Sequence, residues 1–113
     1  MALSPVRRVA YLAYWYFSHI EMAGHRDYFL TSKADHSEVI AALRAVGAME
    51  QASVLSAALE AVHDASSRAP AEYGNRFAAG VEFADLAEFD DAFERCTHPV
   101  PQCLDGLSRQ TRE

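Results

Sequence analysis

The chain of 113 residues has the length of one domain, expected to span residues 1–113 and to bury roughly 60–70% of the unfolded chain's surface. Half of the residues are hydrophobic, and five glycines and four prolines are few, so the composition favours helices. Sixteen acidic residues against ten basic ones give a net charge of −6. This balance argues against direct binding of nucleic acid or an anionic membrane, which depends on Lys and Arg, and leaves a basic protein partner open.

A first helix is predicted from about Pro5 to Met22, because Ser4 can cap it and proline fits its first turn. Within it, residues 9–22 direct apolar or aromatic side chains to nearly every side, as is typical of a buried helix. Gly24 is placed to end this helix. We therefore expect an all-α fold, a compact bundle of about five to six helices around a buried aromatic N-terminal helix.

The same N-terminal segment has a superficial likeness to a signal peptide, since Arg7 and Arg8 precede an apolar run. Three tyrosines, a tryptophan and the lack of a small-residue cleavage site argue against that interpretation. The run is also shorter than the roughly 18 residues of a membrane span. A cytoplasmic protein is expected.

Residues 25–32 are expected to form one or two helical turns that fold Tyr28 and Phe29 back onto the first helix. A polar loop should then lead to a helix capped by Asp35, with Glu38 at the spacing of a capping box and Gly47 at the end. The next helix follows across a very short turn, so the two should form an antiparallel hairpin. Its apolar positions are Met49, Ala52, Leu55, Leu59 and Val62.

The later chain is expected to contain a polar connection over 64–69 and a weaker helix over 70–79 that stops before Gly80. A clearer amphipathic helix is predicted over 82–95, because Leu86, Phe89 and Phe93 fall within one arc. Residues 98–113 are interpreted as a tail or a short helix. Cys96 and Cys103, near the prolines at 99 and 101, are interpreted as reduced thiols, with a local disulfide as the alternative.

No pattern of a nucleophile with its base, a metal cluster or a phosphate-binding glycine loop is present, so we expect a non-enzyme without cofactor or metal. The nearest approach to a catalytic group is His19, Glu21 and His25, whose spacing is poor for a shared helical face. Asp90 and Asp91 diverge by about 100° on a helix and are interpreted as solvated carboxylates.

The segment 82–94 combines six acids with no Lys or Arg. Four of them recur every three residues, which gives one carboxylate per ~4.5 Å of helix axis, against ~3.4 Å per phosphate of one DNA strand. The segment is therefore either a phosphate-like row that binds a basic protein or an ordinary solvated face. The candidate binding residues are Glu82, Asp85, Glu88, Asp90, Asp91 and Glu94.

Residues 23–62 resemble the core of the DMP19-like family of bacterial DNA-mimic proteins. Ala-Gly-His at 23–25 stands where that family has a Gly-Gly-Phe-like turn, and Asp-Tyr-Phe at 27–29 stands at its next aromatic turn. Val-Gly-Ala at 46–48 matches the junction of two helices, and residues 86–93 are similar to a later Leu-Asp-x-x-Phe segment. The likeness places the family core at about 9–95.

The resemblance implies an all-helical fold and an acidic homodimer that occupies the DNA-binding surface of a transcription factor. Our leading expectation is a non-enzymatic acidic module that binds a basic protein surface. An immunity or antitoxin protein that blocks a toxin is the second hypothesis. A small enzyme using His19, Glu21 and His25 is the third.

Overall fold

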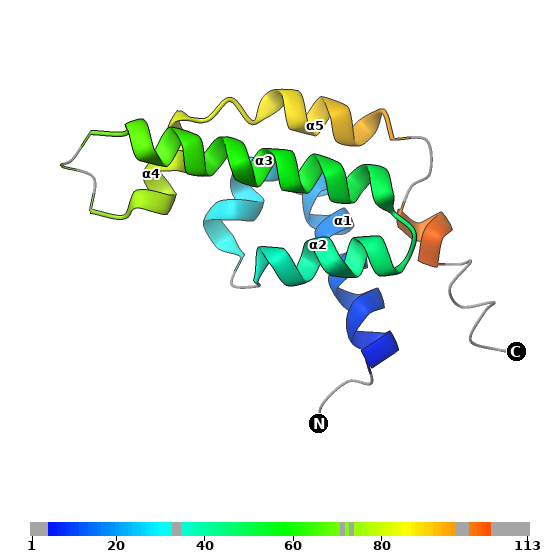
Figure 1. Ribbon diagram of the computed structural model, residues 1–113. Helices are drawn as coiled ribbons and strands as arrows, with labels where there is room; N and C mark the ends of the chain where they lie inside the picture. The colour runs from blue at the N-terminus through cyan, green and yellow to red at the C-terminus, as the bar shows by residue number, and fades with distance from the viewer. Residues whose placement is uncertain (1–4, 33–34, 71, 73, 97–99, 105–113) are drawn as a thin grey trace, which may run out of the picture.

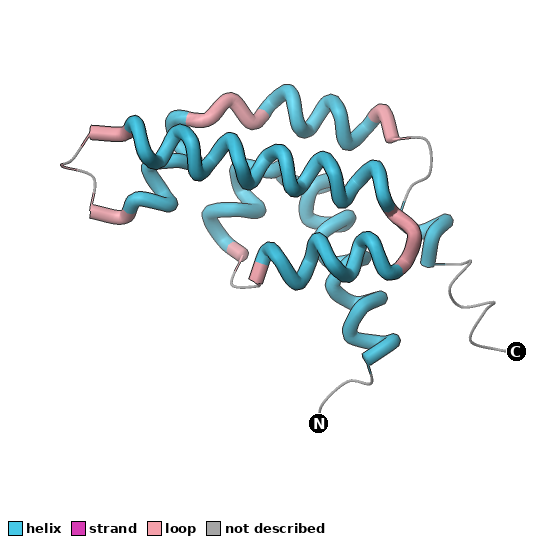
Figure 2. Tube along the Cα trace, in the orientation of Figure 1, coloured by secondary structure: helices cyan, strands magenta, loops and turns pink. Residues whose placement is uncertain are grey.

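The computed structural model describes residues 5–32, 35–70, 72, 74–96 and 100–104, and every regular element in that part of the chain is helical. The helices are α1 (Pro5–Thr31), α2 (His36–Ala45), α3 (Met49–Arg68), α4 (Arg76–Phe83) and α5 (Ala87–Glu94), and residues 100–104 add a short helical segment. In Figures 1 and 2, α3 runs along the middle of the molecule with α2 and α5 on either side of it, while α1 lies behind them. The all-α prediction is confirmed.

The first helix bends at Gly24, where the backbone takes φ 82° and ψ 175°. Only glycine adopts this conformation readily. A Cβ at this position would also lie 2.8 Å from Oδ2 of Asp90. Gly24 thus ends the regular part of α1 as predicted, and the helical turns after it return Tyr28 against Tyr16, with ring centroids 5.2 Å apart.

α1 is buried on one side only. Tyr16 is fully buried, whereas Tyr11 and Tyr14 are 57% and 53% exposed. The described helices that contact α1 are α2, α4 and α5, and they pack against the side that carries its buried residues. Residues 9–22 are therefore not buried on nearly every side as the sequence indicated, and the buried side carries Leu12, Ala13, Tyr16 and Ile20.

The predicted hairpin of α2 and α3 is present. The carboxylate of Asp35 caps α2 by accepting from the backbone N–H of Ser37 at 2.9 Å, while Glu38, the other half of the expected capping box, binds Arg8 on α1. Gly47 takes φ 87° in the turn. Of the apolar positions predicted for the second helix of the hairpin, Ala52, Leu55 and Val62 are buried, Leu59 is half-buried against the core, and Met49 is exposed. The first helix and its turn bury Val39, Ile40, Leu43 and Val46.

Two boundaries after α3 differ from the prediction. α3 continues through the expected connection to Arg68, and the next helix is α4, capped by Asn75, rather than a helix over 70–79. Gly80 lies inside α4 and does not stop it. A Cβ on Gly80 would lie 2.2 Å from the carbonyl oxygen of Val62, so this glycine allows α4 to approach α3 closely.

The single helix predicted over 82–95 is wrong, because the chain divides there into α4 and α5. Ala84 is extended, and Leu86 enters the core with 5% of its surface exposed. Burying Leu86 changes the chain direction before α5 begins. Leu86, Phe89 and Phe93 still face the core as predicted. The tail expected over 98–113 lies outside the described residues except for 100–104.

Candidate functional site

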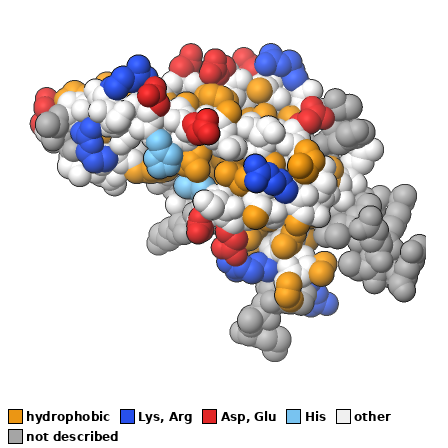
Figure 3. All heavy atoms as spheres, viewed as in Figure 1, with side chains coloured by type: hydrophobic (Ala, Val, Ile, Leu, Met, Phe, Trp, Pro, Cys, Tyr) orange, Lys and Arg blue, Asp and Glu red, His pale blue; other side chains and the backbone are white. Residues whose placement is uncertain are grey.

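The acidic residues of the later chain lie on two helices and the link between them. Figure 3 shows acidic side chains along the edge of the molecule formed by α5. Five of the six candidates are exposed, and within the described residues none of the five forms an ion pair. We call these five the acidic face: Glu82, Asp85, Glu88, Asp91 and Glu94.

The acidic face is less regular than the sequence indicated. Glu88, Asp91 and Glu94 follow one another at three-residue steps along the exposed part of α5, while Phe93 is buried. Asp85 lies in the link, where its carboxylate accepts from the backbone N–H of Ala87 at 3.3 Å. Glu82 belongs to α4. A helical row of three carboxylates, extended by two on the preceding segment, replaces the expected continuous row.

Asp90 is only partly the solvated carboxylate that the sequence suggested, because its side chain is 40% exposed and also accepts hydrogen bonds from a buried residue. Its Oδ1 accepts from the backbone N–H of His25 at 2.8 Å and lies 2.6 Å from Nδ1 of the same residue. The other ring nitrogen, Nε2, lies 2.7 Å from the hydroxyl of Tyr16. Three side chains from α1 and α5 therefore form one hydrogen-bonded chain, which we call the Tyr16–His25–Asp90 chain.

The protonation of this chain follows from its donors and acceptors. An ionised Asp90 can only accept, so Nδ1 of His25 carries the hydrogen and Nε2 accepts from the Tyr16 hydroxyl. Burial lowers the pKa of His25, and the Asp90 carboxylate opposes that effect. Burial raises the pKa of Tyr16 well above its ordinary value. Both rings are accordingly neutral at neutral pH.

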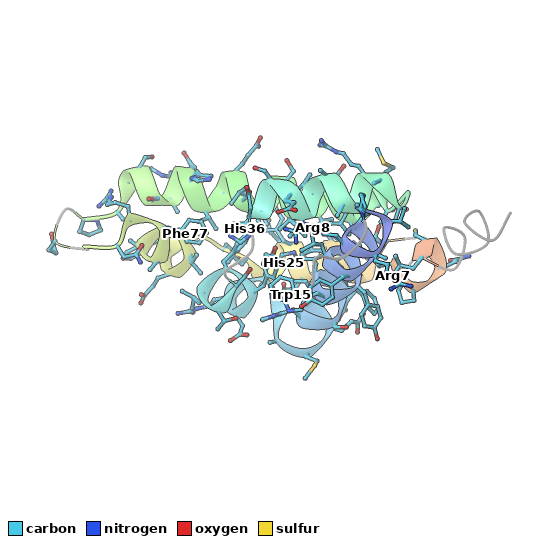
Figure 4. The ribbon with its side chains drawn as sticks, turned by 90° about the horizontal axis from the view of Figure 1, so that it is seen from below. Arg7, Arg8, Trp15, His25, His36 and Phe77 are labelled. Atoms are coloured by element: carbon cyan, nitrogen blue, oxygen red, sulfur yellow. The ribbon has the colours of Figure 1, made fainter. Side chains whose placement is uncertain are left out.

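A second aromatic cluster lies on the other side of Tyr28. Figure 4 shows His36 beside Phe77, with His25 and Trp15 between the helices. The rings of His36 and Phe77 are stacked, with centroids 5.7 Å apart and planes 13° apart, and Nδ1 of His36 lies 3.2 Å from the Tyr28 hydroxyl. Burial lowers the pKa of His36; the charge of Asp35 opposes this effect, and nearby His63 adds to it. Through these contacts the rings of Tyr28, His36 and Phe77 pack against one another.

The constellation of His19, Glu21 and His25 is not assembled. Nε2 of His19 lies 2.7 Å from Oδ2 of Asp27 near the surface, whereas His25 is fully buried and bonded to Asp90. Glu21 is exposed. Within the described part of the chain, no three His, Cys, Asp or Glu side chains are grouped so that they could hold a metal ion. Cys96 and Cys103 are free thiols.

Sequence reasoning missed a groove between α1 and α5. It consists of a cavity of about 250 Å³ and one of about 80 Å³ that share Glu21, Phe93 and Glu94 as lining residues. The larger cavity is also lined by Ile20, Met22, Ala23, Gly24 and Asp90, and the smaller by Phe17, Gln51 and Cys96. No local sequence pattern predicts it, because its two walls come from opposite ends of the chain.

The chain matches one family. A family model described as DMP19-like protein matches residues 1–107, nearly the whole chain. No curated protein and no solved structure matches it. None of the helices in the described ranges is long and apolar enough to cross a membrane. Because the match extends far beyond half of its length, the chain belongs to the DMP19-like family.

Proposed function

We propose that this chain is a non-enzymatic, cytoplasmic protein-binding module whose acidic face docks on a basic surface of another protein, such as the DNA-binding surface of a regulator. The observation that carries the proposal is the exposure of five carboxylates on neighbouring segments, none of them in an ion pair within the described residues. Such a concentration of unpaired charge attracts a partner of opposite charge and speeds its association.

The geometry of α5 supports a likeness to nucleic acid. Glu88, Asp91 and Glu94 are spaced by three residues, so their carboxylates repeat every ~4.5 Å along the axis, comparable with the ~3.4 Å of DNA helix axis per phosphate of one strand. A basic surface with Lys and Arg at phosphate spacing could pair with this row. Membership of the DMP19-like family is consistent with such a role.

The arrangement of the histidines supports a binding role over a catalytic one. His25 has no exposed surface, and both of its ring nitrogens are occupied by Tyr16 and Asp90. A general base must come within hydrogen-bond reach of its substrate. His19 is more accessible, but its closer contact is the carboxylate of Asp27 at 2.7 Å. The hydroxyl of Thr31 lies 3.4 Å from Nε2 of His19, and it donates at 2.8 Å to the carbonyl oxygen of Asp27.

Affinity capture from a lysate of the source organism tests the proposal. The bait would be compared with an acidic-face variant carrying Glu82→Gln, Glu88→Gln and Asp91→Asn, which leaves the link residue Asp85 intact. A control variant with Glu60→Gln, Asp64→Asn and Glu72→Gln removes the same charge elsewhere. We expect wild type and control to recover a DNA-binding protein that the acidic-face variant loses, with binding that weakens steeply as salt rises.

Other outcomes have definite meanings. A toxin recovered in place of a regulator would favour the immunity-protein hypothesis. Equal recovery by all three baits, or affinity that is unchanged from low to high salt, would overturn the proposal, because the acidic face would then be a solvated surface.

A further inference from the structure

The groove between α1 and α5 opens beside the acidic face. Glu94 belongs to both, since it is exposed on α5 and lines both cavities of the groove. Glu21 stands on the α1 wall and is also exposed. A partner that covers the outer side of α5 would therefore pass over the groove mouth, and the surface there is concave rather than flat.

The walls of the groove combine two kinds of chemistry. Ile20, Met22 and Phe93 supply apolar surface, and Met22 is 87% exposed. Three carboxylates, those of Glu21, Asp90 and Glu94, line the same cavity, and its lining contains no Lys or Arg. An apolar ligand would leave the carboxylates uncompensated, and a small cation would not use the apolar wall. The lining is complementary to a long side chain with an apolar stem and a positive end.

One of these carboxylates, that of Asp90, is held in place by hydrogen bonds from His25. Both hydrogen bonds from His25 end on Oδ1 of Asp90, and they come from a fully buried residue. The second oxygen, Oδ2, lies against Gly24, which is itself part of the groove wall. The acceptor is therefore already oriented before a ligand arrives, which reduces the entropy lost on binding.

We propose that the groove binds an arginine side chain of the basic partner, with the aliphatic stem against Ile20 and Phe93 and the guanidinium among the carboxylates of Glu21, Asp90 and Glu94. This inference rests on the proposed function and names the residue type that the partner inserts. Arginine fits better than lysine, because its planar guanidinium donates five hydrogen bonds in several directions and is more weakly hydrated. Buried arginines are also frequent binding hot spots.

The proposal is tested by NMR titration at low salt, with N-acetyl-arginine amide as the probe and the uncharged isostere N-acetyl-citrulline amide as its control. We expect saturable shifts centred on the backbone amides of residues 20–24 and 93 with the arginine probe only. Glu21→Gln with Glu94→Gln should lower the association constant about five- to tenfold, at roughly 0.5–0.7 kcal/mol for each exposed carboxylate. Glu82→Gln with Glu88→Gln removes the same charge outside the groove and should change it less than about twofold.

A variant that fills the groove distinguishes the contribution of the groove's shape to binding from that of its charge. Ala23 is exposed and lines the larger cavity, so Ala23→Phe should occlude the groove with the net charge kept. The shifts that the arginine probe causes at residues 20–24 should then disappear. Capture of the partner through the acidic face should weaken but remain dependent on salt. Thermal melts of each variant establish that the fold is retained.

Three results would overturn the groove proposal. The first is an arginine response that spreads along the outer side of α5 and falls equally in the two charge variants, and the second is the absence of saturable binding. The third is capture of the partner by the Glu21→Gln, Glu94→Gln bait as by wild type, because the groove would then have no part in recognition. Undiminished capture by the acidic-face variant would instead remove the proposed function.

Discussion

The two sides of α5 use the same residue types differently. On the outer side Asp91 is exposed and forms no ion pair within the described residues, whereas its neighbour Asp90 holds two hydrogen bonds from His25. A rotation of about 100° around the helix separates these two aspartates. Asp90 therefore supports the fold in addition to lining the groove, whereas Asp91 contributes only charge that remains available to a partner. Substitution of Asp91 should affect binding without affecting stability, and substitution of Asp90 should lower stability.

The largest effect on stability is expected at Gly24 of α1, which lies against Asp90. Gly24→Ala forces a side chain into a backbone conformation that favours glycine and toward Oδ2 of Asp90, so we expect a loss of about 2–4 kcal/mol in the free energy of unfolding. Gly74→Ala is the matched control, since nothing lies within 4 Å of its Cβ position. Urea denaturation measures both. Equal losses at the two glycines would contradict the account of the bend.

The aspartate pair gives the direct comparison of the two sides. Asp90→Ala leaves the buried N–H groups of His25 without their acceptor and should cost about 2–3 kcal/mol. Asp91→Ala removes the same charge from the outer side and should change the free energy of unfolding by less than about 0.5 kcal/mol. If the two variants unfold at the same urea concentration, the hydrogen bonds of Asp90 do not support the fold.

The Tyr16 end of the Tyr16–His25–Asp90 chain should contribute less to the free energy of unfolding. Tyr16→Phe removes the hydroxyl that donates to Nε2 of His25 and should cost about 1–2 kcal/mol. Tyr14→Phe, at an exposed position on the same helix, should change stability by less than about 0.5 kcal/mol. NMR of the His25 ring nitrogens would detect the lost hydrogen bond, and an unchanged Nε2 signal in Tyr16→Phe would contradict the assigned donor.

The pH dependence should be the smallest effect. The pKa of His25 is lowered in the folded state, so the unfolded chain binds more protons once the pH approaches the ordinary value of 6.5. The stability from neutral His25 is complete above that value and is lost as the pH falls toward the folded pKa. His36 contributes with the same sign. Urea midpoints should therefore decrease from pH 7.5 to pH 5.5, and NMR titration should place the pKa of His25 below 6.5.

Features that depend on neighbouring residues were predictable. The cap at Asp35, the left-handed Gly47 and the break at Gly24 all follow from short-range conformational preferences, and the structure confirms them. The hairpin of α2 and α3 follows from apolar positions at helical spacing and a turn too short for another geometry.

Features that depend on contacts between distant segments could not be predicted from the sequence. Gly80 looked like a helix stop because local propensity disfavours glycine in a helix, but the carbonyl of Val62 on α3 leaves room for no other residue. The apolar arc of residues 82–95 predicted one helix, and burial of Leu86 divided it into two. Likewise, 65 residues separate His25 from Asp90, so no spacing rule could pair them or reveal the groove.

The contact between His25 and Asp90 also constrains when the fold can be completed during synthesis. At roughly 5–20 residues per second, a ribosome adds Asp90 about 3–13 seconds after His25. Over that interval the bend at Gly24 lacks the acceptor for His25, and the hairpin of α2 and α3 is synthesised before that acceptor is added. The nascent chain therefore carries an unfinished α1 until its last helices emerge, and a chain cut before residue 90 would never obtain that acceptor.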